Sequence, residues 1–122
     1  MKTAIFGDIH GNFTAWQQAF SLMKKKNIDR FLCTGDLVGY GPQPDKVVSD
    51  IRSKIKAGLN FRVVVGNHDK GAVSDDSLSR FNSHARQSLL WTRKQLSAEN
   101  RQFLIDLPQI IEEKNFILTH GT

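Results

Sequence analysis

The sequence has 122 residues, of which 39% are hydrophobic and 24% charged, enough for one hydrophobic core and too few for two. It contains no apolar run near the roughly 20 residues that span a bilayer, and Asp8 interrupts the first apolar run before a signal-peptide core could form. The single Cys33 excludes a disulfide framework and favours a buried, unreactive thiol in a reducing compartment. We therefore expect one globular domain over residues 1–122, with no membrane partner and a cytoplasmic location.

The charge balance is basic, with 17 Lys and Arg against 12 Asp and Glu and a formal net charge of +5. Such an excess can indicate nucleic-acid binding. Here Lys24, Lys25 and Lys26 end a predicted helix, where cations suit the helix dipole, and the other basic residues are scattered rather than collected in one stripe. Nucleic acid is therefore disfavoured as a partner and remains only as a weaker alternative, testable by the salt dependence of oligonucleotide binding.

Short apolar runs alternate with segments of helical periodicity along the chain. Strands are predicted at Thr3–Phe6, Arg30–Cys33, residues 61–65 and residues 116–119, with residues 109–111 as a fifth candidate. Apolar side chains recur at helical spacing from Phe13 to Met23 and again after Pro44. A third connection contains a helical stripe through Leu89 and a second helix between the candidate N-cap Ser97 and Pro108. This order predicts βαβ units, and hence an α/β fold with a mostly parallel sheet flanked by helices.

A polar cluster follows each of four predicted strands. In chain order the clusters are Gly7-Asp8-Ile9-His10-Gly11, Gly35-Asp36, Gly66-Asn67-His68-Asp69 and His120-Gly121. Asp8 and Asp36 are 28 positions apart, and Asp36 and Asn67 are 31 apart, close to the roughly 30 residues of one βαβ unit. Because right-handed crossovers return each strand in the same direction, the clusters are expected at one edge of the sheet, where open α/β folds keep their sites.

The gathered side chains provide oxygen and nitrogen donors and no thiolate. They are Asp8, Asp36, His10, His68, His120 and Asn67. This mixture suits Mn, Fe, Zn or Ni rather than a structural thiolate zinc site. Two aspartates cannot both stay ionised at close range without a cation. A pair of divalent ions about 3.5–4 Å apart, bridged by one carboxylate, would resolve this, activate a water and hold phosphate oxygens for in-line attack.

With these motifs the chain resembles the calcineurin-like metallophosphoesterase superfamily. That superfamily has Asp-x-His after the first strand, Gly-Asp after the second, Gly-Asn-His-Asp/Glu after the third, and later histidines. Residues 35–42 and 81–97 are most similar to its prokaryotic phosphodiesterase-like branch. The resemblance implies the N-terminal half of an α/β/β/α sandwich. It also implies two divalent metal ions, with Mn the first to test in vitro, and hydrolysis of a phosphodiester or small phosphomonoester.

The resemblance also implies roles for single residues. Asp8 and His10 would hold the first metal ion, Asp36 would bridge the two ions, and Asn67 and His120 would hold the second. His68 would protonate the leaving oxygen or donate a hydrogen bond to the phosphate. Three weaker candidates for substrate contact or for orienting the ligands are Asp69, Tyr40 and Asn12, and for Asp69 a place in a surface turn is an equal alternative.

The sequence also departs from the family pattern. Protein serine/threonine phosphatases have Asp-Arg where this chain has Gly39-Tyr40, which disfavours phosphoproteins as substrates. The sequence ends at Thr122, before the half of the family domain that carries a Gly-His-x-His segment and a second sheet, and His84 does not match that segment. We therefore expect a truncated domain with an incomplete ligand set and one partly uncovered sheet face. The alternative to an enzyme is a weakly active or inactive metal-binding module that self-associates to cover its sheet.

Overall fold

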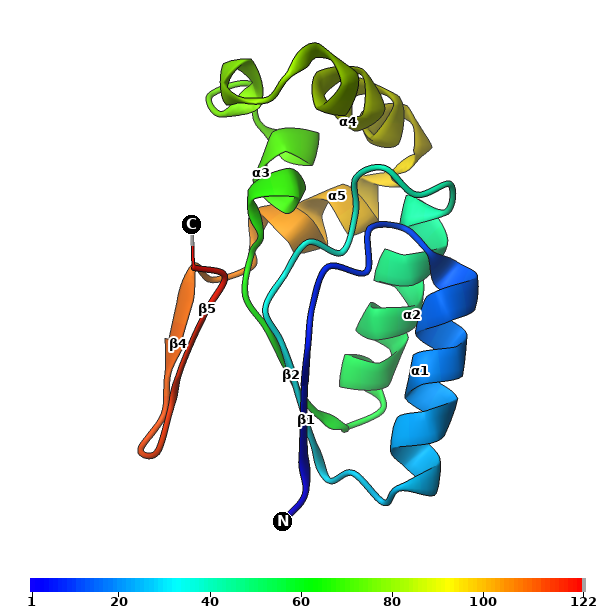
Figure 1. The fold of residues 1–122 in the computed structure, drawn as a ribbon, viewed down its shortest axis with the longest axis vertical. Coiled ribbons are helices and arrows are strands. Elements are labelled where there is room, and N and C mark those ends of the chain that lie inside the picture. The colour runs from blue at the N-terminus through cyan, green and yellow to red at the C-terminus, as the bar shows by residue number, and fades with distance from the viewer. Residues whose placement is uncertain (122) are drawn as a thin grey trace.

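The computed structural model, which describes residues 1–121, is built on a three-stranded parallel sheet. The strands β1 (Thr3–Phe6), β2 (Arg30–Cys33) and β3 (Asn60–Val63) lie side by side in the order β1-β2-β3. The connections are α1 (Phe13–Lys25) and α2 (Pro44–Lys56), and both helices cover the same face of the sheet (Figure 1). The two predicted βαβ units are therefore confirmed, and their uniform handedness places both helices on one side.

The register of the sheet brings the carboxyl ends of the three strands to one level. Phe6 pairs with Cys33, and Cys33 pairs with Val63. The loops that follow the strands consequently start side by side at the upper edge of the sheet in Figure 1. Pro44 opens α2 at its first turn, where its fixed φ and missing N–H cost nothing.

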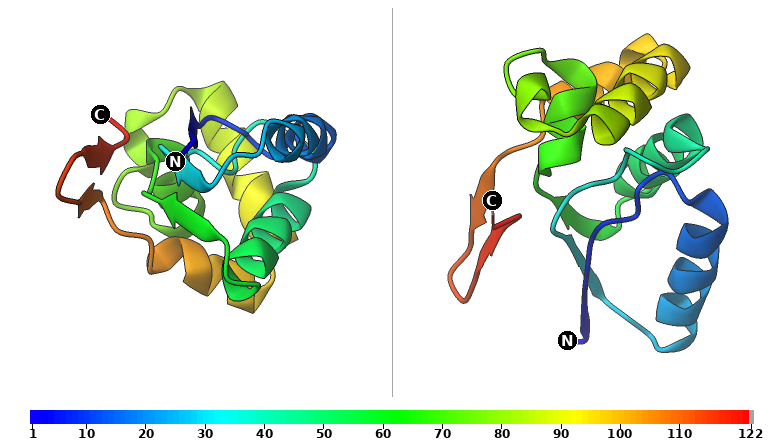
Figure 2. Two further views of the ribbon diagram at one scale, coloured as in Figure 1. Left: turned by 90° about the horizontal axis from the view of Figure 1, so that it is seen from below. Right: turned by 45° about the horizontal axis from the view of Figure 1, so that its top comes forward.

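A helical layer follows β3 and lies over that edge. It consists of α3 (Asn67–Val73), a 3₁₀ turn (Leu78–Arg80), α4 (Ser83–Gln95) and α5 (Ala98–Ile105) (Figures 1 and 2). Ser97 is the N-cap of α5, as predicted, and its side chain accepts the N–H of Asn100. The sequence did not predict α3, because its polar residues show no apolar periodicity and the helix is only 7 residues long.

The last two predicted strands form a separate hairpin instead of extending the parallel sheet. β4 (Ile110–Glu112) pairs antiparallel with β5 (Ile117–Thr119), with Ile111 opposite Leu118. The connection between them is a tight turn, which allows an antiparallel pair but is far too short for a parallel crossover. The hairpin lies against the face of the sheet opposite to α1 and α2, where Leu118 packs with Leu32 and Val64 (Figure 1).

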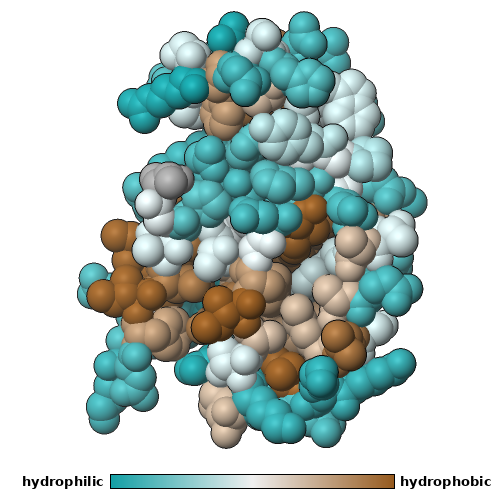
Figure 3. Space-filling view, in the orientation of Figure 1, coloured by the Kyte–Doolittle hydropathy of each residue, from teal (hydrophilic) through white to brown (hydrophobic). Residues whose placement is uncertain are grey.

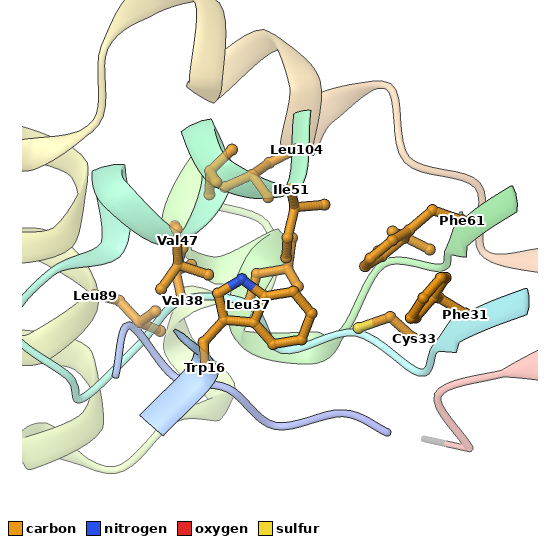
Figure 4. Packing of buried hydrophobic residues seen from close by; sticks show 13 residues of the cluster. Trp16, Phe31, Cys33, Leu37, Val38, Val47, Ile51, Phe61, Leu89 and Leu104 are labelled. Atoms are coloured by element: carbon orange, nitrogen blue, oxygen red, sulfur yellow. The ribbon is translucent and has the colours of Figure 1, made fainter. Parts of the chain in front are cut away.

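The main core lies between the sheet and the helices α1 and α2 (Figure 4). The rings of Phe31 and Phe61 stack at 5.6 Å between centroids. Trp16 of α1 packs edge-on against Phe61 at 6.1 Å and donates its Nε1–H to Asp50 at 2.7 Å. Cys33 is completely buried in this core, as the sequence predicted.

The opposite face of the sheet is only partly covered, as expected. Ile5 points to the same side as its neighbour Leu32, yet it is 70% exposed, and Ile117 on the hairpin is 67% exposed. Figure 3 shows this apolar surface over β1 and the β4–β5 hairpin. None of the helices among residues 1–121 has the length and hydrophobicity needed to cross a bilayer.

Candidate functional site

Backbone hydrogen bonds continue past the ends of β1 and β2 and join the two loops that follow. Asp8 donates its N–H to the carbonyl of Gly35 at 2.9 Å, and His10 donates to the carbonyl of Asp36 at 3.0 Å. As a result, the side chains of Asp8, His10 and Asp36 offer ligand atoms that all lie within 4.8 Å of one another. The structure therefore brings together the residues of the first two polar clusters.

The same two loops contain an unusual concentration of left-handed backbone. Asp8, His10, Asp36 and Tyr40 have φ values of 57°, 49°, 59° and 64°. A residue with a Cβ rarely adopts this conformation, at a cost of about 1–3 kcal/mol each, and such residues persist where the surrounding structure holds them. The concentration of such residues in these two loops indicates that the surrounding structure holds the loops in this conformation.

The loop after β2 passes very close to its neighbours, and glycine makes this approach feasible. A Cβ on Gly41 would collide with the carbonyl oxygen of His10, and one on Gly39 would lie 2.7 Å from His68 Nδ1. Gly39 also has φ +93°, which a residue with a side chain rarely adopts. Glycine at these two positions therefore lets the first, second and third loops pack around one point.

Two histidines point their Nε2 atoms at one carboxylate oxygen. His10 Nδ1 lies 2.9 Å from the carbonyl oxygen of Val38, and His120 Nδ1 lies 2.7 Å from that of Thr34. A carbonyl oxygen only accepts, so each Nδ1 carries the hydrogen and each Nε2 presents a lone pair. These Nε2 atoms lie 3.7 Å and 3.5 Å from Oδ2 of Asp36, which is 4% exposed. Asp36 thus stands between two imidazoles.

Asn67, the first residue of α3, completes this group. Its Oδ1 lies 2.9 Å from His120 Nε2, so two acceptors face each other beside the Asp36 carboxylate. Turning the amide would let its nitrogen donate to Asp36 Oδ2 at 3.1 Å and to His120 Nε2 at 2.9 Å. A cation would satisfy the same acceptors with the amide oxygen facing inward. Carboxylate, imidazole and amide donors fit a divalent first-row metal ion, so the residues present suit the ions that the sequence predicted.

His68 lies beside this group and is held by a different set of contacts. Its backbone N–H donates to Asp36 Oδ1 at 2.9 Å. Its ring packs against the rings of His10, Tyr40 and Phe81 at centroid distances of 4.9, 4.8 and 4.9 Å. Its Nδ1 is buried and has no hydrogen-bond partner among residues 1–121. Burial lowers the pKa of His68, with the Asp36 carboxylate opposing this shift.

Asp69 is completely buried, which excludes the surface turn considered from the sequence. Its carboxylate accepts four backbone N–H groups, those of Asp36, Leu37, Val38 and Gly66, at 2.9, 2.9, 3.2 and 3.0 Å. Burial raises the pKa of Asp69 to about 7, although the N–H groups act in the opposite direction. Asp69 therefore ties the loop that carries Asp36 to the start of α3.

The remaining candidates occupy different places. Tyr40 is 54% exposed and donates its backbone N–H to Ser88 Oγ at 2.7 Å. Its ring packs edge-on against that of His10, with 5.3 Å between the ring centroids. Asn12 caps α1, because its side chain accepts the N–H of Ala15 at 3.0 Å. His84 is an exposed residue of the first turn of α4.

Sequence reasoning missed a basic and aromatic wall next to Asn67 and His120. A pocket of about 280 Å³ adjoins these two residues and is also lined by Lys70, Arg80 and Phe81. Lys70 directly follows the third polar cluster, which was the one available signal. Arg80 ends the 3₁₀ turn and Phe81 follows it, and in this segment no periodic pattern predicts the direction of a side chain.

Comparison with known proteins gives a consistent result. The family model of calcineurin-like phosphoesterases matches residues 1–122. An uncharacterised protein of Methanocaldococcus jannaschii is 40% identical over 122 residues, which is 97% of this chain and 48% of that protein. A symmetrical bis(5'-nucleosyl)-tetraphosphatase of Psychromonas ingrahamii is 41% identical over 70 residues, which is 57% of this chain and 24% of that enzyme.

Solved structures agree with the sequence relatives. A metallophosphoesterase from Sphaerobacter thermophilus has 34% identity and a TM-score of 0.74, covering 96% of this chain and 45% of its own. A hypothetical protein from Pyrococcus horikoshii has 26% identity and a TM-score of 0.77, covering 92% and 50%. The chain spans about half the length of the relatives that it matches over nearly all of its own residues. Since the family model extends over every residue, and the fold is that of the N-terminal half of these proteins, the chain belongs to the calcineurin-like phosphoesterases, a family of hydrolases.

Proposed function

We propose that this chain carries a dinuclear metal centre and hydrolyses a phosphodiester or a small phosphomonoester. The observation that supports this most directly is the position of Asp36 Oδ2, 3.7 Å from His10 Nε2 and 3.5 Å from His120 Nε2. Asp8, His10 and Asp36 would hold one ion. Asp36, Asn67 and His120 would hold the other, with Asp36 shared.

Divalent ions bound there would lower the pKa of a water molecule and offset the negative charge of a phosphate. The chain itself keeps the ligands oriented. The carbonyls of Val38 and Thr34 hold His10 and His120 with Nδ1 protonated, so that both Nε2 lone pairs point inward. The N–H of His68 fixes the other oxygen of Asp36.

His68 is proposed to serve the leaving oxygen. Its ring is held between Tyr40 and Phe81, next to the ligands and outside their acceptor set. A departing alkoxide needs a proton, and an imidazole is the side chain most often used to supply one. His68 would donate that proton, or a hydrogen bond to the phosphate. The exposed ring of Tyr40, which contacts both His10 and His68, would meet the substrate at the rim.

The finer identity of the site is also proposed. Mn²⁺ is the ion to test first, because nitrogen and oxygen donors without thiolate suit it. Because two of the relatives are named bis(5'-nucleosyl)-tetraphosphatases, we propose nucleotide polyphosphates as candidate substrates. The buried thiol of Cys33 fits a reducing compartment, and we propose that the protein is cytoplasmic.

The decisive experiment combines metal binding with turnover. The 122-residue chain is titrated with Mn²⁺ by calorimetry and assayed with bis-p-nitrophenyl phosphate and p-nitrophenyl phosphate. We expect Mn-dependent hydrolysis, reduced at least about 100-fold in Asp36→Asn, because the shared ligand loses its charge. The exposed Asp106→Asn serves as the matched control. Equal turnover by wild type and Asp36→Asn would contradict the proposal, and the ratio of the two rates separates diesterase from monoesterase.

A second candidate is a metal-binding module with little or no turnover that associates with another copy of itself. The specific observation in its favour is exposed apolar surface on β1 and on the hairpin, where Ile5 and Ile117 are 70% and 67% exposed. Folded protein that binds Mn²⁺ and hydrolyses neither ester would favour this candidate.

A further inference from the structure

The pocket beside Asn67 and His120 is not explained by metal binding. It has a volume of about 280 Å³ and is walled by α3, the 3₁₀ turn and the hairpin. Its lining residues beyond those two include Lys70, Ser77, Arg80, Phe81 and Gln109. It therefore adjoins the proposed metal centre with side chains that belong to no metal ligand set.

The pocket is positively charged. Lys70 and Arg80 line it, and neither side chain forms an ion pair with a residue in the range 1–121. The carboxylate of Asp75 is engaged elsewhere, by Arg93 at 2.6 Å. Asp76 lines an adjoining pocket that shares Lys70. Two cations without carboxylate partners next to a phosphate site would bind a further anionic group.

Two other side chains suit the same occupant. Ser77 Oγ is buried without a hydrogen-bond partner among the described residues, so its hydroxyl has no protein group to satisfy it. Phe81 lines the pocket, and its ring lies 4.9 Å from that of His68. Phe81 thus contacts both the pocket and the ring of His68. The pocket therefore lies on the side of the site where the leaving oxygen would depart.

We infer that this pocket binds the leaving part of the substrate, and that this part carries a second phosphate. The inference rests on the proposed function and specifies its substrate as a phosphoric anhydride, such as a nucleotide with a chain of phosphates, in which the bond that breaks joins two phosphates. A water molecule would form a bond to the phosphorus, and the bond from that phosphorus to the bridging oxygen would break. The leaving phosphate would keep the electron pair of that bond and accept a hydrogen bond from His68, and one proton of the water would pass to solvent. Lys70 and Arg80 stabilise the negative charge left on the departing phosphate.

A binding experiment tests the pocket without turnover. The Asp36→Asn chain is titrated with inorganic tripolyphosphate by calorimetry, with no added metal. We expect Lys70→Gln and Arg80→Gln each to weaken binding about 5- to 10-fold, since each removes one charge-assisted contact. Lys94→Gln, a basic residue of α4 outside the pocket, should leave the affinity unchanged, and Asp76→Asn should strengthen it. Equal binding by Lys70→Gln, Arg80→Gln and the parent would overturn the inference.

A turnover experiment tests the substrate class. With Mn²⁺, Lys70→Gln should lower kcat/KM for diadenosine tetraphosphate about 10-fold and leave that for bis-p-nitrophenyl phosphate, which has no second phosphate, within about 2-fold. An equal fall for both compounds, or no change for either, would overturn the inference while the proposed hydrolysis stands. If the wild type hydrolyses neither compound, the proposed function fails, and tripolyphosphate binding still decides whether the pocket holds phosphate.

Discussion

A single buried carboxylate organises the backbone around the candidate metal centre. Asp69 accepts hydrogen bonds from the backbone N–H groups of Asp36 and the two residues that follow it in the loop after β2. It accepts a fourth from Gly66, just before α3. Water cannot replace the carboxylate as the acceptor of these N–H groups, because Asp69 and the residues that donate to it are buried. The carboxylate therefore fixes Asp36 and also Val38, whose carbonyl orients His10.

Replacing Asp69 should cost both stability and metal affinity. Asp69→Ala leaves four buried N–H groups without their acceptor, and we expect the free energy of unfolding to fall by about 3 kcal/mol. Mn²⁺ affinity should fall as well, because the loop that holds Asp36 loosens. Urea unfolding and calorimetric titration measure the two effects. Asp76→Ala is the control, with an expected change within about 0.5 kcal/mol, and an Asp69 variant as stable as this control would contradict the role assigned to Asp69.

Cys33 provides a pH-dependent prediction. Burial raises the pKa of its thiol from 9.0 to about 12. Between these values the unfolded chain has lost the thiol proton and the folded chain has kept it, so the free energy of unfolding falls as the pH rises. From pH 8 to pH 10 the wild type should lose about 1.4 kcal/mol more than Cys33→Ala, measured by urea unfolding at both pH values. An identical pH dependence in the two proteins would show that the thiol ionises freely.

The identity of the gathered residues was predictable, whereas their orientation was not. Asp8, His10 and Asp36 could be placed because strand ends and βαβ spacing fix where a side chain emerges. The tautomer of His10 depends on the Val38 carbonyl, which the loop after β2 brings to it, and no local pattern predicts the path of that loop. The role of Asp69 likewise depends on backbone N–H groups that lie 31–33 positions away along the chain, and no local sequence pattern predicts such contacts.

At the level of elements, a polar network attaches α5 to α2. Asn100 is 1% exposed, and its Nδ2 donates to Asp45 Oδ1 at 2.7 Å and to Ser49 Oγ at 2.8 Å. Its Oδ1 accepts from Arg52 at 2.9 Å. Every partner of this amide lies on α2, so the network fixes the position of α5 beside the helices that support the sheet.

Disrupting this network should reduce stability without affecting the metal centre. Asn100→Ala leaves buried polar groups of α2 unsatisfied, and we expect a loss of about 2 kcal/mol in the free energy of unfolding. Mn²⁺ affinity should stay within about 2-fold, because distant sites without shared partners behave independently. Urea unfolding and metal titration of the same samples test this, with the exposed Asn115→Ala as control. A loss of metal affinity at unchanged stability would instead assign Asn100 to the site.

Elements with strong periodicity were predicted well, and those defined by longer-range contacts were not. β1 and β2 begin and end where expected, while β3 was predicted to extend to residue 65 and ends at Val63. The difference arises because Val65 donates its N–H to Pro108, beyond the parallel sheet. The pairing of β4 with β5 was missed for a similar reason: an apolar run reveals a strand but does not name its partner.

At the level of the whole molecule, the two faces of the sheet are unequal. One face is sealed by α1 and α2, and the hairpin covers the other only over β2 and the residues after β3. The edge strand β1 leaves Ile5 exposed, and Ile110 and Ile117 of the hairpin are also exposed. Figure 3 shows apolar surface over β1 and the hairpin. Exposed apolar surface of this kind is typical of contact surfaces, and the second candidate function proposes another copy of the chain as the partner.

The 122-residue chain should therefore associate as its concentration rises, and the apolar face should be responsible. We expect light scattering after size exclusion to give a mass above 13.8 kDa at high concentration. Ile5→Thr combined with Ile117→Thr should restore the monomer mass, while the free energy of unfolding changes by at most about 1 kcal/mol because both side chains are already exposed to water. Leu22→Thr, an exposed apolar residue of α1 on the far side, is the matched control and should leave association intact. A compact monomer at every concentration would contradict this prediction and remove the main support for a self-associating module, leaving the hydrolytic site as the role that the structure favours.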